Sequence, residues 1–167
     1  NLHLPDFRAS ERTFQLITQV AGRSGSSTLG GKTILQTFEP DNYALQCAAK
    51  YDFEQFMKTE LEYRKKLHYP PYSRLIRLEL RHPRAEVVEK QALLTRERLL
   101  MWIEEADLRQ TDIIGPAPCY YEKRAGLYRW QMLLRGTNPG RLLEQHPPSE
   151  WDLGGATVVV TVDPTTV

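Results

Sequence analysis

The chain has 167 residues, of which 41% are hydrophobic and 26% are charged, and its formal net charge is +1. This is ordinary globular composition, suited to one domain of about 100 residues with a smaller piece beside it. No apolar run approaches the roughly 20 residues that cross a bilayer, and no signal-peptide pattern opens the sequence. We therefore expect a cytoplasmic protein with no membrane partner. Because the first residue is Asn rather than Met, we also expect a fragment of a longer protein.

The first 72 residues are predicted to be mainly helical, with a domain boundary at the proline pair that follows. The predicted elements are a helix over 10–22 with Ser10 as N-cap, a glycine-rich loop over 22–31, a strand over 32–38, and helices over about 42–50 and from Asp52. Tyr69-Pro70-Pro71-Tyr72 ends helical geometry, because proline lacks an amide hydrogen and restricts its predecessor.

From Ser73 onward the pattern predicts six elements in the order βαββαβ. They are a strand around 76–80, a helix over 84–106, strands over about 111–123 and 127–135, a short helix over about 138–146 and a strand over 158–162. Pro116 and Pro118 remove amides from the second strand, so it must lie at a sheet edge. A ferredoxin-like split fold puts its second strand at an edge. The fold class is therefore predicted as α+β (mixed α/β), with a ferredoxin-like domain.

Charge is spread unevenly along this pattern. Most Lys and Arg residues lie between Lys58 and Arg141, and after Arg141 there is none, whereas four acidic residues follow. One positively charged face is therefore predicted, which is compatible with nucleic acid.

Two other features suggest sites that the chemistry does not support. Cys47 and Cys119 lie far apart without Cys-x-x-Cys spacing, so we expect neither a metal site nor a disulfide. Residues 26–33 nearly spell a phosphate-binding loop, but Ser26 replaces its first Gly. That loop must follow a strand and open a helix, and here the predicted order is reversed. A glycine-rich connection is the better interpretation.

Short segments along nearly the whole chain carry a joint signal that none carries alone. They are Leu4–Arg12, Gln19–Gly25, Ile34–Phe38 with Pro40-Asp41, Leu67–Tyr72, Gly115–Pro118, Arg124–Gln131 and Val162–Pro164. Gln19–Gly25 resembles the last conserved motif of superfamily 2 helicases, Gln-x-x-Gly-Arg-x-Gly-Arg. In order and spacing the set resembles the bacterial replication-restart helicases of the primosomal protein N′ (PriA) family.

This resemblance implies a domain organisation. Residues 1–38 would be the end of the second RecA-like helicase lobe (the motif VI region), 39–72 a helical connector, and 73–167 a ferredoxin-like, ribosomal-protein-S10-like domain that binds DNA and partners. The parent protein would couple ATP hydrolysis to 3′→5′ unwinding of abandoned replication forks. Its cofactors would be ATP, Mg and zinc, with the zinc held upstream of Asn1, and this fragment would hold none.

The resemblance also implies partners. They are fork or branched DNA, single-stranded DNA, single-stranded DNA-binding protein and the primosome proteins that load the replicative helicase. The fragment is expected to be a monomer in the cytoplasm, associated with the nucleoid.

By the same resemblance, Gln19 and Arg23 would contribute catalytic groups to an ATP site. A guanidinium can stabilise the charge that develops on a transferred phosphoryl group. The second Arg of the motif falls on Ser26, so either Arg23 suffices or ATP turnover in the parent is weak or lost. The alternative for Arg23 is a surface charge that complements the helix dipole. The fragment alone is predicted to be inactive.

The predicted strand 127–135 carries the second candidate site. Tyr128 and Trp130 are expected in the core, which leaves Arg129 and Gln131 on the opposite face, while the hairpin tip adds Lys123 and Arg124. We predict Lys123, Arg124 and Arg129 as DNA-binding residues and Arg129 with Gln131 as partner-binding residues, because a guanidinium beside an amide suits a phosphate or carboxylate acceptor. A solvated charged face is the alternative.

One departure from the family pattern lies beside this face. Relatives often carry a basic residue at the position of Leu127, so a pocket for the acidic tail of single-stranded DNA-binding protein would be weakened or rearranged here.

A second function remains open, namely a stand-alone S10-like module that binds nucleic acid or protein without a motor. Residues 1–38 discriminate between the two. If they belong to a helicase lobe, they should pack poorly by themselves or borrow contacts from the connector.

Overall fold

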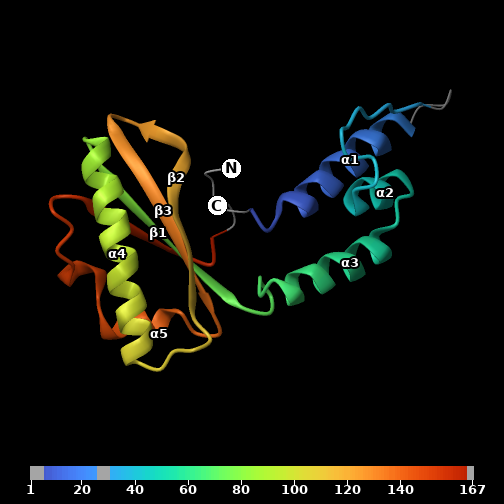
Figure 1. The fold of residues 1–167 in the computed structure, drawn as a ribbon. Helices are drawn as coiled ribbons and strands as arrows, with labels where there is room; N and C mark the ends of the chain where they lie inside the picture. Colours follow the sequence, from blue (N-terminus) through green and yellow to red (C-terminus); the bar gives the residue numbers. More distant parts are fainter. Residues whose placement is uncertain (1–5, 26–30, 165–167) are drawn as a thin grey trace. The chain divides into compact units, whose positions relative to one another are not determined.

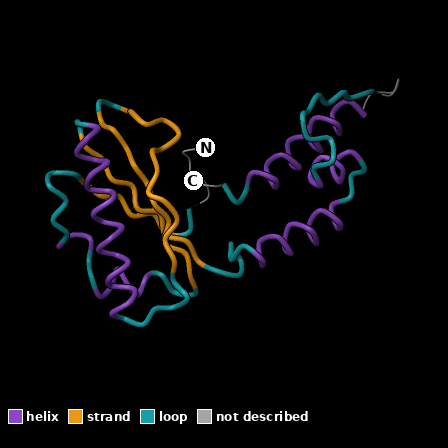
Figure 2. The backbone as a smooth tube through the Cα atoms, in the orientation of Figure 1, coloured by secondary structure: helices purple, strands orange, loops and turns teal. Residues whose placement is uncertain are grey.

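The computed structural model describes residues 6–25 and 31–164, and these divide into two compact units, Asp6–Leu67 and the chain from His68 onward (Figures 1 and 2). The first unit contains three helices, α1 (Ala9–Gly25), α2 (Tyr43–Ala49) and α3 (Phe53–Lys66). The second contains an antiparallel sheet with helices α4 and α5.

The helices of the first unit begin at short polar side chains. The Asn42 side chain accepts from the amide of Ala44, and the Asp52 side chain accepts from the amide of Gln55. Both satisfy amides that have no partner inside the helix. Helix α1 starts at Ala9, after Asp6 Oδ1 accepts from the amide of Arg8. The predicted N-cap, Ser10, is therefore wrong, because the helix begins before it.

Two further expectations for the first unit are wrong. Helix α1 continues to Gly25, so residues 22–25 are helical rather than part of a loop. Residues 31–37 belong to no helix or strand, and they are exposed. A strand requires a neighbour for its amides and carbonyls, and no strand among residues 6–25 and 31–67 supplies one.

An aromatic core joins the three helices. Phe14 of α1 stacks on Phe56 of α3 with ring centroids 4.2 Å apart and an interplanar angle of 11°. Ala44, Cys47 and Ala48 of α2 complete the buried cluster. Helix α1 thus draws its packing from the predicted connector.

Ion pairs join the first and third of these helices beside that core. Arg64 Nη2 lies 2.9 Å from Glu11 Oε2, and Arg64 Nε lies 2.7 Å from Glu60 Oε1. The Tyr43 hydroxyl donates to the other oxygen of Glu60. Hydrogen bonds from Arg8 and then Arg64 hold the pKa of Glu11 below its ordinary value.

The second unit has the predicted element order. It comprises β1 (Arg74–His82), α4 (Ala85–Glu105), β2 (Asp112–Arg124), β3 (Leu127–Gly136), α5 (Gly140–Gln145), a 3₁₀ turn (Pro148–Glu150) and β4 (Thr157–Val162). The strands lie in the order β2-β3-β1-β4, and every neighbouring pair is antiparallel. This α+β architecture with β2 at an edge and β3 inside confirms the ferredoxin-like prediction.

Helix α4 covers one face of the sheet (Figure 1). Its buried side chains are Val88, Ala92, Thr95 and Leu99, the stripe that the helical period predicts. They meet the alternating residues of β1 and β3, including Leu78, Leu80 and Met132. The core face of β3 also carries Tyr128 and Trp130, which confirms their predicted packing role.

Candidate nucleic-acid and partner-binding face

A tight hairpin presents the predicted basic tip. Lys123 pairs with Tyr128 and Arg124 with Leu127, so only Ala125 and Gly126 form the loop. Both loop residues have positive φ, 51° and 79°. That geometry is a type I′ turn, whose twist matches the strands and in which glycine avoids the cost of a side chain. The turn therefore holds the exposed Lys123 and Arg124 side chains at one end of the sheet.

The predicted site residues do not all share one face. By the strand alternation, Arg129 and Gln131 face away from α4, and Arg124 lies on the same side through its pairing with Leu127. Lys123 lies on the other side, where its Nζ is 4.7 Å from the centre of the Tyr128 ring. The tip thus offers cations to both sides of the sheet edge.

Arg129 is largely engaged within the domain. Its Nε and Nη2 donate to the carbonyl of Tyr121 at 3.2 and 2.7 Å, and its Nη1 lies 3.4 Å from Glu79 Oε1. Glu79 is only 4% exposed and also pairs with Arg81 at 2.8 Å. A buried carboxylate needs such partners, since desolvation would otherwise neutralise it. The Arg129 side chain is 14% exposed and Gln131 is buried, so neither presents a full set of polar atoms to solvent.

A bulge in β2 lies beside Arg129. Pro118 pairs with Trp130 and Lys123 with Tyr128, so residues 119–122 lie opposite Arg129 alone. Cys119 points into the protein, whereas Tyr120 and Tyr121 are 75% and 68% exposed. Burial, followed by the nearby Glu79, raises the pKa of Cys119 to about 11, which keeps the thiol protonated and unreactive at neutral pH.

The other candidate residues lie on helix α1. Gln19 and Arg23 are one helical turn apart, and both side chains are exposed. Ser26, the departure from the helicase motif, lies outside the described residues, as do residues 27–30 of the glycine-rich segment. The ATP-site assignment of Gln19 and Arg23 stays a prediction.

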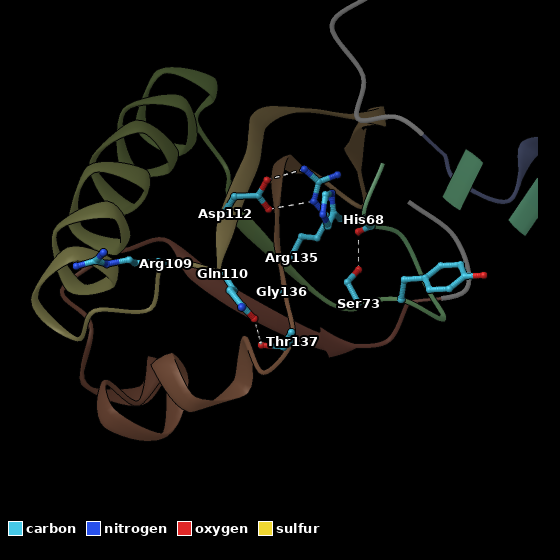
Figure 3. Close-up of a pocket in the computed structure, with 9 residues that line it drawn as sticks. His68, Ser73, Arg109, Gln110, Asp112, Arg135, Gly136 and Thr137 are labelled. Carbon is cyan, nitrogen blue, oxygen red and sulfur yellow. Dashed lines mark hydrogen bonds and ion pairs between the residues drawn. The ribbon is translucent and has the colours of Figure 1, made fainter. Parts of the chain in front are cut away.

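A pocket of about 430 Å³ opens at the opposite end of β3 (Figure 3). Its walls come from residues 68–73, 109–112 and 135–137. Arg135 lies across it, with Nη2 2.5 Å from Asp112 Oδ2 and Nε 3.0 Å from Oδ1, while its guanidinium stacks 5.2 Å from the Tyr69 ring. The charge of Arg135 is thus balanced by a bidentate pair.

Three features of this domain were not predicted from the sequence. The first is Glu79, whose carboxylate lies beside Arg129 and which the sequence shows as an acidic residue between Arg77 and Arg81 on an alternating strand. The second is the exposed Tyr120-Tyr121 pair, which lies one residue before the basic tip. The third is the pocket at Arg135, which no local pattern predicts because its walls are far apart in the sequence.

Two further observations concern metal binding and membrane insertion. Across residues 6–25 and 31–164, no group of three His, Cys, Asp or Glu side chains is arranged to hold a metal ion. Over the same residues, no helix has both the length and the apolar character needed to cross a bilayer.

Comparison with known proteins agrees with the fold. The sheet order and the helix-covered face define an α+β domain of ferredoxin-like topology. Residues 65–165 match the family model of the primosomal protein N C-terminal domain. That match covers more than half of the chain, and the chain therefore belongs to this family.

Similar proteins share one name. The replication restart protein PriA of Chlamydia muridarum is 39% identical over 137 residues, 82% of this chain. The proteins of that name from Bacillus subtilis and Treponema pallidum are 36% and 40% identical over 134 residues, 80% of the chain. These alignments cover 18%, 16% and 20% of the three relatives, so the chain spans about a fifth of their length or less.

Proposed function

We propose that the chain is the C-terminal part of an ATP-dependent replication-restart helicase, and that its own task is to bind fork DNA and partner proteins. The observation that carries the proposal is the tight β2–β3 hairpin, which holds Lys123 and Arg124 exposed at the end of the sheet. Two fixed cations at a sheet edge suit the phosphates of a nucleic-acid backbone. The name of the relatives supports the assignment to replication restart.

The helical unit supports a motor in the parent protein. Ile34 and Phe38 are exposed apolar residues in a segment that belongs to no helix or strand. Such side chains gain free energy by burial, which a neighbouring part of a longer protein would provide. We therefore keep 1–38 as the end of a helicase lobe, 39–72 as a connector and 73–167 as the DNA- and partner-binding domain. In that parent, Gln19 and Arg23 face the ATP.

The partners follow from the same assignment. Fork and single-stranded DNA bind at Lys123, Arg124 and Arg129, while the acidic tail of single-stranded DNA-binding protein binds near Arg129 and Gln131. The engagement of Arg129 with Tyr121 and Glu79 makes it the weakest DNA contact of the three. Leu127 reduces the charge available to the acidic tail. The other proposed partners are primosome proteins. We also propose that the fragment is a monomer in the cytoplasm and that it associates with the nucleoid.

The alternative is a stand-alone S10-like module. The packing of Phe14 of α1 against α2 and α3 does not favour this alternative, because those contacts come from the connector, as we expect for the end of a helicase lobe. The exposed Ile34 and Phe38 count against it, because a self-sufficient module has no need of them.

The test is the salt dependence of fork-DNA binding by the 167-residue chain. Each phosphate contact contributes about 0.9 to the slope of log K against log salt. The Lys123→Ala/Arg124→Ala double variant should bind roughly tenfold or more weakly at low salt, with the slope reduced by about 1.8. Arg129→Ala should have the smaller effect.

Arg109→Ala is the matched control for this experiment. Arg109 is exposed and pairs with Asp107, but it precedes β2 and so lies at the other end of that strand from the tip. Its variant should retain the affinity and slope of the unmodified chain. Unchanged curves for the double variant at several salt concentrations would overturn the DNA-binding role of the tip.

A further inference from the structure

The bulge of β2 exposes two large aromatic side chains next to each other. Tyr120 and Tyr121 are 75% and 68% exposed, and only Glu122 separates them from Lys123 and Arg124 of the basic tip. We propose that Tyr120 and Tyr121 form a stacking platform for the unpaired bases of single-stranded nucleic acid, whose phosphates are held by Lys123 and Arg124. This inference rests on the proposed function and adds to it a contact with the bases of single-stranded nucleic acid that a duplex does not make.

The platform is held from beneath. The carbonyl of Tyr121 accepts two hydrogen bonds from Arg129, and the buried Glu79 holds that guanidinium in turn. Cys119, at the start of the bulge, is buried and anchors the strand to the domain. Bulges redirect side chains, and a bulge fixed by a buried ion pair keeps that direction. The two rings are therefore presented by a fixed backbone rather than by a mobile loop.

The geometry of the rings favours unpaired bases. Their centroids are 5.0 Å apart and their planes are perpendicular. Bases in a duplex are parallel and covered by their neighbours, so two perpendicular rings cannot both stack on them. A single strand can splay successive bases, and stacking on aromatic side chains tolerates any base.

The surrounding charge favours a nucleic acid as the occupant. Two cations, Lys123 and Arg124, follow the rings after a single acidic residue, Glu122. Single-strand sites combine cations that track the backbone with aromatic rings that take the bases. An acidic peptide is the alternative ligand for this surface. It would bind the same cations but would not need the perpendicular rings.

The experiment measures binding of a fluorescent oligothymidylate of about 20 nucleotides to the 167-residue chain at several salt concentrations. Tyr120→Ala/Tyr121→Ala should weaken binding about tenfold or more, because alanine removes stacking on at least one base. The salt slope should not change, since no phosphate contact is lost. Tyr120→Phe/Tyr121→Phe should bind like the unmodified chain, because phenylalanine retains the ring.

A blunt duplex and an acidic peptide serve as the comparison ligands. The affinity for duplex should be the same for the tyrosine variants and the unmodified chain. When the peptide is added, Tyr120→Ala/Tyr121→Ala should still bind oligothymidylate more weakly than the unmodified chain does. An equal loss of duplex affinity in Tyr120→Ala/Tyr121→Ala would overturn base stacking. So would a loss of affinity in that variant for the peptide alone. If Lys123→Ala/Arg124→Ala weakens oligothymidylate binding and Tyr120→Ala/Tyr121→Ala has no effect, this inference fails and the proposed function stands.

Discussion

At the scale of single residues, the structure separates charges that look alike in the sequence. Arg124 and Arg129 flank the same turn, yet Arg124 is exposed and Arg129 donates to a carbonyl and lies beside a buried carboxylate. Removing Arg129 would leave Glu79 with one fewer partner in a buried position, whereas removing Arg124 leaves no buried group unsatisfied. Arg129 therefore supports the bulge, and Arg124 remains available for a ligand.

Cys119 gives a prediction about alkaline pH. Its pKa is raised from 9.0 to about 11 in the folded chain, so the unfolded state ionises first. The contribution of the protonated thiol to the free energy of unfolding is fully present below about pH 9. It is lost as the pH rises toward 11, and the total loss is about 2–3 kcal/mol. Urea unfolding followed by tryptophan fluorescence reports this unit, because all three tryptophans lie in residues 102–151.

The comparison is with Cys119→Ala, which has no thiol to titrate. The unmodified chain should lose stability more steeply than the variant between pH 9 and pH 11, whatever their difference at pH 7. Parallel curves across that interval would show that the buried thiol does not carry the effect.

At the scale of elements, partners decide which patterns become strands. Residues 74–82 alternate and form β1 between two neighbours, whereas residues 32–38 are rich in β-forming residues and form no strand. The difference lies in hydrogen bonding, since a ladder requires a second strand. β2 illustrates the opposite case. It contains Pro116 and Pro118 and is still a strand, because an edge position tolerates missing amides.

The packing of α1 provides a prediction at this scale. Phe14 is 5% exposed and stacks on Phe56, so Phe14→Ala should destabilise the helical unit by about 3 kcal/mol through lost burial and a cavity. Leu16→Ala is the matched control, because Leu16 is 61% exposed on the same helix and its loss should cost less than about 0.5 kcal/mol. Urea unfolding followed by far-ultraviolet circular dichroism measures both. Equal effects of the two variants would contradict the observed packing.

At the scale of the whole molecule, the chain joins two units of different chemical character. The first carries the exposed Gln19 and Arg23 on a helix, and the second carries the basic tip on a sheet. A phosphoryl-transfer site needs a phosphate cradle, a metal and a positioned nucleophile in addition to an arginine. We therefore expect the 167-residue chain to hydrolyse no ATP, with or without single-stranded DNA.

This expectation is tested by ATP turnover of the purified chain and of the longer parent protein. In the parent, Arg23→Ala should lower DNA-stimulated turnover by roughly three or more powers of ten, the contribution typical of an arginine finger. Lys58→Ala is the control, since Lys58 is exposed on α3 and lies in the connector rather than in the helicase lobe. Turnover by the 167-residue chain alone, or normal turnover by the Arg23 variant, would refute the assignment.

The sequence by itself determined the elements whose pattern is local. The alternation of β1 and β3 and the helical stripe of α4 report which side of each element is buried, and the prolines of β2 report an edge strand; together they predicted a ferredoxin-like sheet with β2 at its edge. Only the tertiary structure decided the fate of residues 32–38, the engagement of Arg129 by Glu79, and the exposure of Tyr120 and Tyr121. The physical reason is that periodicity is set by the geometry of one element, whereas a strand's partner, a buried charge's counter-ion and a bulge depend on residues that are distant in the sequence.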